Sequence, residues 1–243
     1  MATVRLNKFL ADAGICSRRK ADEHISSGDV YVNGARATLG MKVDPENDQV
    51  VFRRTPVGQH PEKLVYYALY KPPGVVSTAA DEKGRTAVTD LVPRHPRVYP
   101  VGRLDLTSAG LVILTNDGEL AHQLMHPSFV HEKEYEVVVQ APAQVTADEI
   151  KRRFEQGLEI EGKLMQADRV SLLRRSPKRA DIVTLQMVLH TGYNRQIRRM
   201  CVALGLTIVA LLRTRMGKLN LSNLGLKPGQ YRLVSKSDIL ESL

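Results

Sequence analysis

The stretch VGRLDLTSAGLVILTNDGEL, residues 101–120, contains two apolar strands separated by a polar loop. A short apolar run leads into Gly102, Arg103, Leu104 and Asp105, and a Thr-Ser-Ala-Gly turn precedes the second strand. Asp105 therefore lies at a strand-to-loop junction, where a rigid scaffold can present a side chain for catalysis. Aspartate also favours turns because of its local hydrogen bonds to the backbone. The spacing leaves both roles open.

Apolar and β-branched runs continue on both sides of this stretch and predict a larger mixed α/β domain. We expect strands at LVYYALY (64–70), YEVVV (135–139), IVTLQMVL (182–189) and IVALLRT (208–214), and helices at GELAHQLM (118–125) and NRQIRRMCVAL (194–204).

The strand HEKEYEVVVQ, residues 131–140, alternates so that Lys133, Tyr135, Val137 and Val139 share one face. Tyr135 is the aromatic residue of that face. It is either an ordinary core tyrosine or a platform on which an extruded base stacks.

Arginines gather near the start of the predicted helix at 194–204. Spacings of three and four residues place Arg195, Arg198 and Arg199 on one flank. One arginine could pair with a buried carboxylate while the others meet phosphates. The alternative is a solvated basic helix face.

The first part of the chain predicts a small α+β unit. Helical periodicity from Arg5 to Asp12 is followed by Gly14, and a second helix can be capped by Ser17 and ended by Gly28. VYVNGARA then predicts a hairpin, because Asn-Gly favours a tight turn. We expect a domain at residues 1–54, a linker at 55–62, rich in proline and glycine, and a second domain at 63–243.

Bulk composition narrows the class of protein. The chain of 243 residues holds 35 Lys and Arg against 26 Asp and Glu, a formal charge of +9, which favours a polyanionic partner. Cys16 and Cys201 are the only cysteines, so neither a disulfide framework nor a zinc ribbon is expected. The N-terminal residues lack a signal-peptide core and no apolar run reaches membrane-spanning length, so we expect a cytoplasmic protein.

One group of residues has the spacing of metal ligands. Glu119, His122 and His126 could face the same side of a helix, but the His-Glu-x-x-His arrangement is absent and we expect no metal. Dinucleotide-binding and phosphate-cradling glycine loops are also absent.

Taken together, the motifs resemble those of bacterial pseudouridine synthases that modify ribosomal RNA. RLNKFLADAGICSRRKADEHISSGDVYVNG resembles the ribosomal-protein S-four type RNA-binding domain. KPPGVVST, GRLDLTSAGLVILTNDGELAHQLMHP, KEYEV and NRQIRRM resemble the successive catalytic motifs in the family's order. The resemblance implies an α+β fold: a small α+β RNA-binding domain, then a catalytic domain whose mixed, largely antiparallel sheet is flanked by helices.

The resemblance also implies roles for individual residues. Asp105 matches the essential aspartate, Tyr135 the base-stacking tyrosine and Arg198 the basic partner of the aspartate. Arg103 matches an arginine that handles RNA near the flipped base. We expect further RNA contacts, chiefly to phosphates, from Arg5, Lys8, Arg18, Arg19, Lys20, Asn194, Arg195 and Arg199.

The implied reaction is a redox-neutral isomerisation of uridine to pseudouridine, so we expect no cofactor. The uridine must leave its stack before the base is detached and rejoined. Asp105 could attack the sixth carbon of uracil, attack the anomeric carbon, or abstract a proton to form a glycal. We expect ribosomal RNA or a ribosomal subunit assembly intermediate as partner, with a slight preference for large-subunit RNA, and a monomer.

Two other functions use the same residues. A non-catalytic RNA-binding or ribosome-assembly factor would explain the basic residues but not Asp105, Tyr135 and Arg198 together. An RNA glycosidase would begin with similar chemistry and release free uracil.

Overall fold

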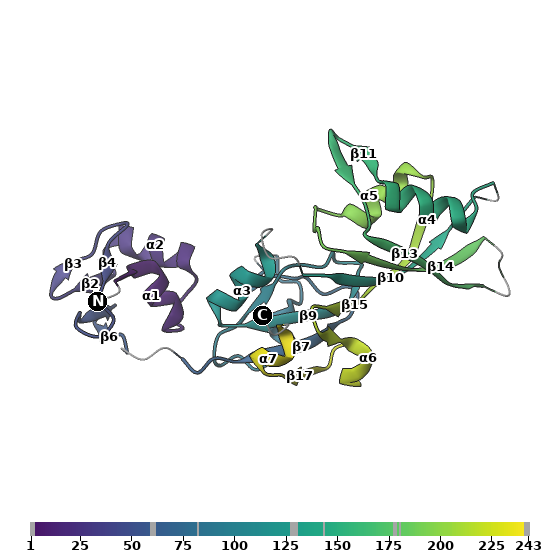
Figure 1. Ribbon diagram of the computed structural model, residues 1–243. Helices are drawn as coiled ribbons and strands as arrows, with labels where there is room; N and C mark the ends of the chain where they lie inside the picture. Colours follow the sequence, from purple (N-terminus) through teal and green to yellow (C-terminus); the bar gives the residue numbers. More distant parts are fainter. Residues whose placement is uncertain are drawn as a thin grey trace. The chain divides into compact units, whose positions relative to one another are not determined.

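The computed structural model describes residues 3–58, 62–81, 83–126, 131–142, 144–176, 179 and 181–240. Residues 59–61 of the expected linker and Pro127, which ends one of the quoted motifs, lie outside the described residues. The chain divides into two compact units (Figure 1). The first consists of the residues up to Leu64 with the short segments His95–Arg97 and Asn116–Gly118, and the second consists of the other residues from Val65 onward.

The first unit packs two helices against short strands. Ser17 Oγ accepts a hydrogen bond from Lys20 N at 3.2 Å and so caps the second helix, which ends at Gly28 with φ 84°. Asn33 and Gly34 form the hairpin turn with positive φ, as predicted. The elements are β1 (Val4–Arg5), α1 (Leu6–Asp12), α2 (Arg18–Ser27), β2 (Val30–Val32), β3 (Ala35–Arg36), β4 (Lys42–Val43), β5 (Val50–Phe52) and β6 (Thr55–Pro56).

The sheet of this unit continues past residue 54, where we expected the domain to end. Strand β6 pairs with β5, and Val57 is buried in the same core as Leu6 and Ile25. Arg53 and Arg54 reverse the chain with positive φ, so that the next residues, which were expected in the linker, add a strand.

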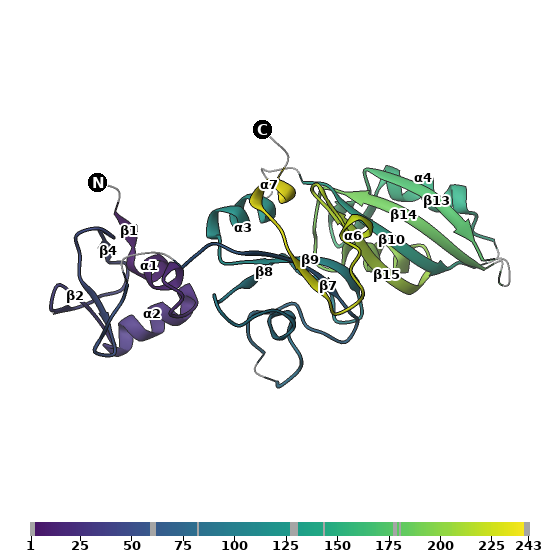
Figure 2. The same ribbon diagram turned by 90° about the horizontal axis from the view of Figure 1, so that it is seen from below.

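The second unit is built on a nine-stranded sheet of order β13-β14-β10-β15-β9-β7-β17, with β16 paired to β15 and β8 to β9 (Figures 1 and 2). All its pairings are antiparallel except that of β9 with β15. The strands are β7 (Tyr66–Lys71), β8 (Tyr99–Val101), β9 (Ala109–Thr115), β10 (Lys133–Gln140), β13 (Arg169–Arg175), β14 (Ile182–Leu189), β15 (Thr207–Met216), β16 (Leu219–Asn220) and β17 (Tyr231–Leu233).

Three cores hold this sheet. One lies under α4 and α5, a second packs α3, α6 and α7 against β7 and β9, and a third contains Leu104, Val112 and Leu114. Tyr135 packs against the first and third cores and so lies where they meet. The remaining elements are the 3-10 helix η1 (Val88–Leu91), α3 (Gly118–Met125), α4 (Ala147–Gln156), β11 (Leu158–Ile160), β12 (Lys163–Met165), α5 (Gln196–Ala203), α6 (Leu221–Leu224) and α7 (Lys236–Ile239).

The strands and helices predicted for the second domain are present, but helix α4 was not predicted. Its signal was available: Thr146 caps the helix by accepting from Glu149 N, and Ile150 and Phe154 lie one turn apart on the buried face. No helix in the described ranges is both long and apolar enough to cross a bilayer.

The two halves of the sheet meet where β9 and β15 pair through Leu212 with Ala109 and Arg213 with Gly110. Gly110 has φ 117°, and a Cβ added there would lie 2.3 Å from Arg213 O and 2.5 Å from Arg213 N. Because both are backbone atoms, a side chain at this position forces the strands apart.

We predict that Gly110→Ala lowers the free energy of unfolding by about 3–5 kcal/mol, because it combines backbone strain with a backbone clash. Gly225→Ala is the matched control, since Gly225 also has positive φ, 63°, but nothing lies within 4 Å of an added Cβ. Its cost should be about 1–2 kcal/mol. Thermal and urea unfolding measure both, and equal losses would show that the crossing tolerates a side chain.

Candidate active site

The loop that carries Asp105 is fixed by hydrogen bonds on both sides of the aspartate. Ser77 Oγ donates to Leu104 O at 3.0 Å and accepts from Leu104 N at 3.1 Å. Lys71 Nζ donates to Ser108 O at 2.7 Å and lies 3.5 Å from Leu106 O. Asp105 therefore lies in a turn whose backbone is fixed by hydrogen bonds, at the junction predicted from the sequence.

Arg198, on α5, reaches this loop from the other half of the sheet. Its Nε lies 2.9 Å from Asp105 Oδ2, and its Nη2 donates to Ser108 Oγ at 2.9 Å. The side chains of Arg198 and Asp105 are 17% and 32% exposed, so the carboxylate stays accessible to a substrate. The expected pairing of Asp105 with an arginine is thus present across 93 residues of sequence.

Tyr135 lies on β10 opposite Arg213 of β15 and is partly buried. The alternation predicted for this strand is confirmed, because Val137 and Val139 are fully buried on the face that Tyr135 shares. Because the ring of Tyr135 packs against two cores, its orientation is restricted.

A cavity of about 630 Å³ opens beside the loop, within the size range of about 300–1,000 Å³ typical of small-molecule sites. Arg103, which is exposed, and Asp105 are both in its wall, whereas Tyr135 and Arg198 do not line it. The lining residues are Val76, Ser77, Thr78, Ala79, Asp81, Arg85, Tyr99, Pro100, Gly102, Arg103, Leu104, Asp105, Leu106 and Met125.

A second carboxylate, Asp81, lines the same cavity but is already engaged. Arg85 donates to it through Nη2 at 2.6 Å, Nε at 3.2 Å and its backbone N at 2.8 Å. These hydrogen bonds lower the pKa of Asp81 to about 2. Asp81 is therefore a weak base.

Lys71 is a site residue to which the sequence analysis gave no role, although it opens the quoted KPPGVVST motif. It is fully buried, and burial lowers its pKa to about 8. The sequence contained a sign that Lys71 is buried. It ends the apolar strand YYALYK, and the alternation of a strand places it on the same face as Tyr67 and Leu69.

The arginines at the start of α5 do not share a flank as predicted. The helix begins at Gln196, and Arg195 precedes it as the N-cap with φ 53°, so the expected helical spacing does not include it. Arg199 forms an ion pair with Glu161 on the β11–β12 side, away from Asp105. Asn194 and Arg195 are exposed.

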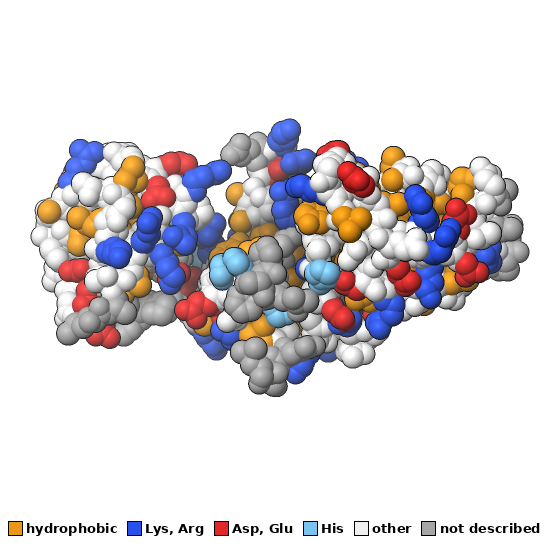
Figure 3. All heavy atoms as spheres, turned by 45° about the horizontal axis from the view of Figure 1, so that its top comes forward, with side chains coloured by type: hydrophobic (Ala, Val, Ile, Leu, Met, Phe, Trp, Pro, Cys, Tyr) orange, Lys and Arg blue, Asp and Glu red, His pale blue; other side chains and the backbone are white. Residues whose placement is uncertain are grey.

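In the first unit the predicted RNA contacts occupy α1, the first turn of α2 and the residue before α1. Arg5, Arg18, Arg19 and Lys20 are exposed, and Lys8 is partly so. Two of them have acidic neighbours: Lys8 Nζ is 2.7 Å from Asp12 Oδ2 and Lys20 Nζ is 3.0 Å from Glu23 Oε2. Lys and Arg side chains gather on the visible face of this unit (Figure 3).

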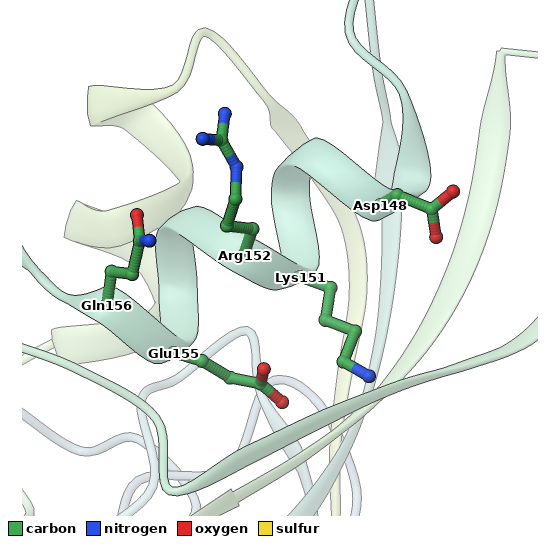
Figure 4. A pocket seen from close by; sticks show the side chains of 5 residues that line it. All are labelled: Asp148, Lys151, Arg152, Glu155 and Gln156. Carbon is green, nitrogen blue, oxygen red and sulfur yellow. The ribbon is translucent and has the colours of Figure 1, made fainter.

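The other candidate features carry no catalytic group. A shallow hollow of about 320 Å³ lies on the exposed face of α4, where Lys151, Arg152 and Glu155 point in different directions (Figure 4). The rings of His122 and His126 lie 4.8 Å apart. Within the described part of the chain, no three His, Cys, Asp or Glu side chains are grouped as metal ligands.

Comparison with known proteins identifies the family of both units. The RNA pseudouridylate synthase family matches residues 65–203, and the S4 domain matches residues 4–50. Ribosomal large subunit pseudouridine synthase B of Bacillus subtilis is 42% identical over 97% of this chain and 93% of its own length. The dual-specificity RNA pseudouridine synthase RluF of Escherichia coli K12 is 38% identical over 99% of this chain and 78% of its own.

A solved pseudouridylate synthase structure aligns with a TM-score of 0.65 at 27% identity and covers 97% of this chain and 98% of the other. The match extends through both units, and it includes the segments that carry Asp105, Tyr135 and Arg198. This chain therefore belongs to the RNA pseudouridylate synthase family and is an RNA pseudouridine synthase with an N-terminal S4 domain.

Proposed function

We propose that this enzyme isomerises a specific uridine of ribosomal RNA, with large-subunit RNA as its substrate, and that Asp105 is the catalytic carboxylate. The observation that carries the proposal is the Asp105–Arg198 pair, 2.9 Å between Oδ2 and Nε, beside a cavity of about 630 Å³. The reaction requires a carboxylate to act on the base or sugar, an aromatic ring on which the extruded base stacks, and a basic surface that binds RNA.

The substrate uridine first leaves its stack and enters the cavity, at a cost of about a few kcal/mol. Tyr135 compensates by stacking on the extruded base. Asp105 then acts on the base or sugar by one of the three routes given above. Arg198 orients the carboxylate through a charge-assisted hydrogen bond, while its second donor is fixed by Ser108.

Ribosomal RNA is proposed as the substrate because of the names of the relatives. The Bacillus subtilis protein, named for the large ribosomal subunit, is 42% identical over nearly the whole chain. The RluF proteins are named as dual-specificity enzymes, so a second RNA target is the alternative.

In this proposal the first unit binds the RNA substrate. We propose that Arg5, Lys8, Arg18, Arg19 and Lys20 contact phosphates. Further phosphate contacts would come from Arg103 in the cavity wall and from Asn194, Arg195 and Arg199 at the start of α5. The proposed RNA-binding domain spans residues 1 to about 57, because Val57 still belongs to its core. The catalytic domain begins at residue 63, and the enzyme acts as a cytoplasmic monomer without a cofactor.

Asp105→Asn should abolish tritium release from ribosomal RNA labelled at the fifth carbon of uridine, since the amide cannot act as nucleophile or base. Asp81→Asn is the control carboxylate of the same cavity and should keep release within about tenfold of wild type, because Arg85 already neutralises Asp81. The reverse result would move the catalytic role to Asp81. Free labelled uracil among the products would identify a glycosidase instead.

Arg198→Met should slow single-turnover isomerisation by about 10²–10³-fold, because it removes a fixed donor from the reacting carboxylate. RNA affinity should change much less. Arg199→Met is the control on the next residue, since Arg199 pairs with Glu161 and not with Asp105. If Arg198→Met retains the wild-type rate, the arginine has no part in the reaction.

The double variant Arg18→Ala/Arg19→Ala should weaken RNA binding and reduce its salt dependence. If both side chains contact phosphates, the slope of log K against log salt falls in magnitude by about 1.4–1.8. Lys42→Ala/Arg54→Ala removes the same charge from other exposed positions of the unit and should leave the slope nearly unchanged. Equal slopes for the two double variants would show that α2 is not the docking face.

A further inference from the structure

Two cations are buried in the middle of the sheet, in one row that crosses four strands. Lys71 is 0% and Arg213 is 2% exposed. Lys71 pairs with Gly110, Gly110 with Arg213, and Arg213 with Tyr135. Cross-strand partners lie on the same face of a sheet. The row therefore lies on the face that carries the Asp105 loop, to which Lys71 is hydrogen-bonded.

The charge of Arg213 is not neutralised by a carboxylate in the described part of the chain. Its Nε donates to Leu111 O at 2.7 Å, but its buried Nη2 has no hydrogen-bond partner there. Arg213 is moreover close enough to two other cations to lower the pKa of Lys71 and of Lys133, although burial is the larger cause in both. Burial of a guanidinium beside two other cations, without a carboxylate partner, costs folding free energy.

A purely structural role does not account for this cost. A neutral donor could bond Leu111 O and hold β15 to β9 without placing a second charge beside Lys71. Asp105 is close enough to raise the pKa of Lys71, but it already has Arg198 as its partner. The site therefore has more buried positive charge than its own carboxylate requires.

The reaction supplies the missing negative charge. When the bond from the anomeric carbon to N1 breaks, its electron pair passes to the uracil ring and spreads to the ring oxygens. The fifth carbon then bonds to the anomeric carbon, its proton is lost to solvent and N1 takes up a proton. Attack of Asp105 on the sixth carbon would likewise place negative charge on the ring.

We propose that Arg213, together with Lys71, provides a fixed positive field that stabilises the negative charge on the uracil ring. Preorganised charges in a dry site act strongly because they need no rearrangement during the reaction. Neither Lys71 nor Arg213 lines the cavity, so both act through space. Lys71 uses its ammonium protons on loop carbonyls, whereas the buried Nη2 of Arg213 has no partner in the described part of the chain. The inference rests on the proposed function, in which the uridine reacts beside Asp105.

The test compares single-turnover rates on two RNAs that carry either uridine or 5-fluorouridine at the target position. Fluorine withdraws electrons and stabilises the ring anion by itself, so an enzyme that has lost its own stabilisation should be partly rescued. Consumption of the target nucleoside is followed by nuclease digestion and mass spectrometry. On the uridine RNA, Arg213→Met should lower the single-turnover rate by about 10²-fold or more relative to wild type. On the 5-fluorouridine RNA, the fold-loss relative to wild type should be smaller by a factor of about ten.

Two further variants separate charge from packing. Arg213→Lys should recover most of the uridine rate, because it restores the charge. Arg215→Met is the matched control on the same strand, where Arg215 Nη2 is paired with Glu132 Oε2 at 2.7 Å. Any loss in this control should be the same on both RNAs.

Equal losses of Arg213→Met on the two RNAs, or an unchanged rate on uridine, would overturn the inference. If circular dichroism shows that Arg213→Met is unfolded, Arg213→Gln, which keeps a donor for Leu111 O, is judged by the same ratio. Failure of the proposed function is distinguishable, because the wild-type enzyme would then form no pseudouridine from the uridine RNA at all.

Discussion

The parallel pairing of β9 with β15 is the constraint on which the active site depends. Leu212 pairs with Ala109 and Arg213 with Gly110, and through these pairs the two halves of the sheet are joined. One half presents the loop of Asp105, which leads directly into β9. The other half presents Tyr135 on β10 and carries α5 with Arg198. A shift of this register would separate the aspartate from its arginine.

The ion pair at the site is better understood as a positioning device than as a source of stability. A partly exposed pair of this kind contributes about 0–1 kcal/mol to folding. Arg198 nevertheless binds two acceptors, Asp105 Oδ2 and Ser108 Oγ, on either end of one tight turn. The planar guanidinium suits this double contact, and a lysine would replace only one of the two bonds. Together with Ser77 and Lys71, it fixes the loop that carries the carboxylate.

The positive charges of the molecule are of two kinds, which differ in their exposure to solvent. Exposed residues such as Arg18 and Arg19 on the first unit and Arg103 at the cavity are suited to phosphates, and their effect is screened by salt. Buried residues such as Lys71 and Arg213 are shielded from salt and keep a fixed orientation. The surplus of positive charge in the composition includes both kinds, and only burial distinguishes them.

The sequence by itself determined the features that depend on a few neighbouring residues. Ser17 as a cap, the Asn33–Gly34 turn, the alternation around Tyr135 and the junction at Asp105 all follow from local backbone preferences and from the periods of helix and strand. The family resemblance added the pairing of Asp105 with Arg198, because motif order carries information that spacing does not.

Only the tertiary structure decided which distant groups meet and which charges are buried. In the tertiary structure Arg199 pairs with Glu161 and Arg195 lies outside the helix. Strand β6 belongs to the first unit, and Lys71 and Arg213 are buried in one row. These outcomes depend on the register between β7, β9, β15 and β10, which lie far apart in the chain. Strand register is set by the packing of whole faces, and no local pattern of residues specifies it.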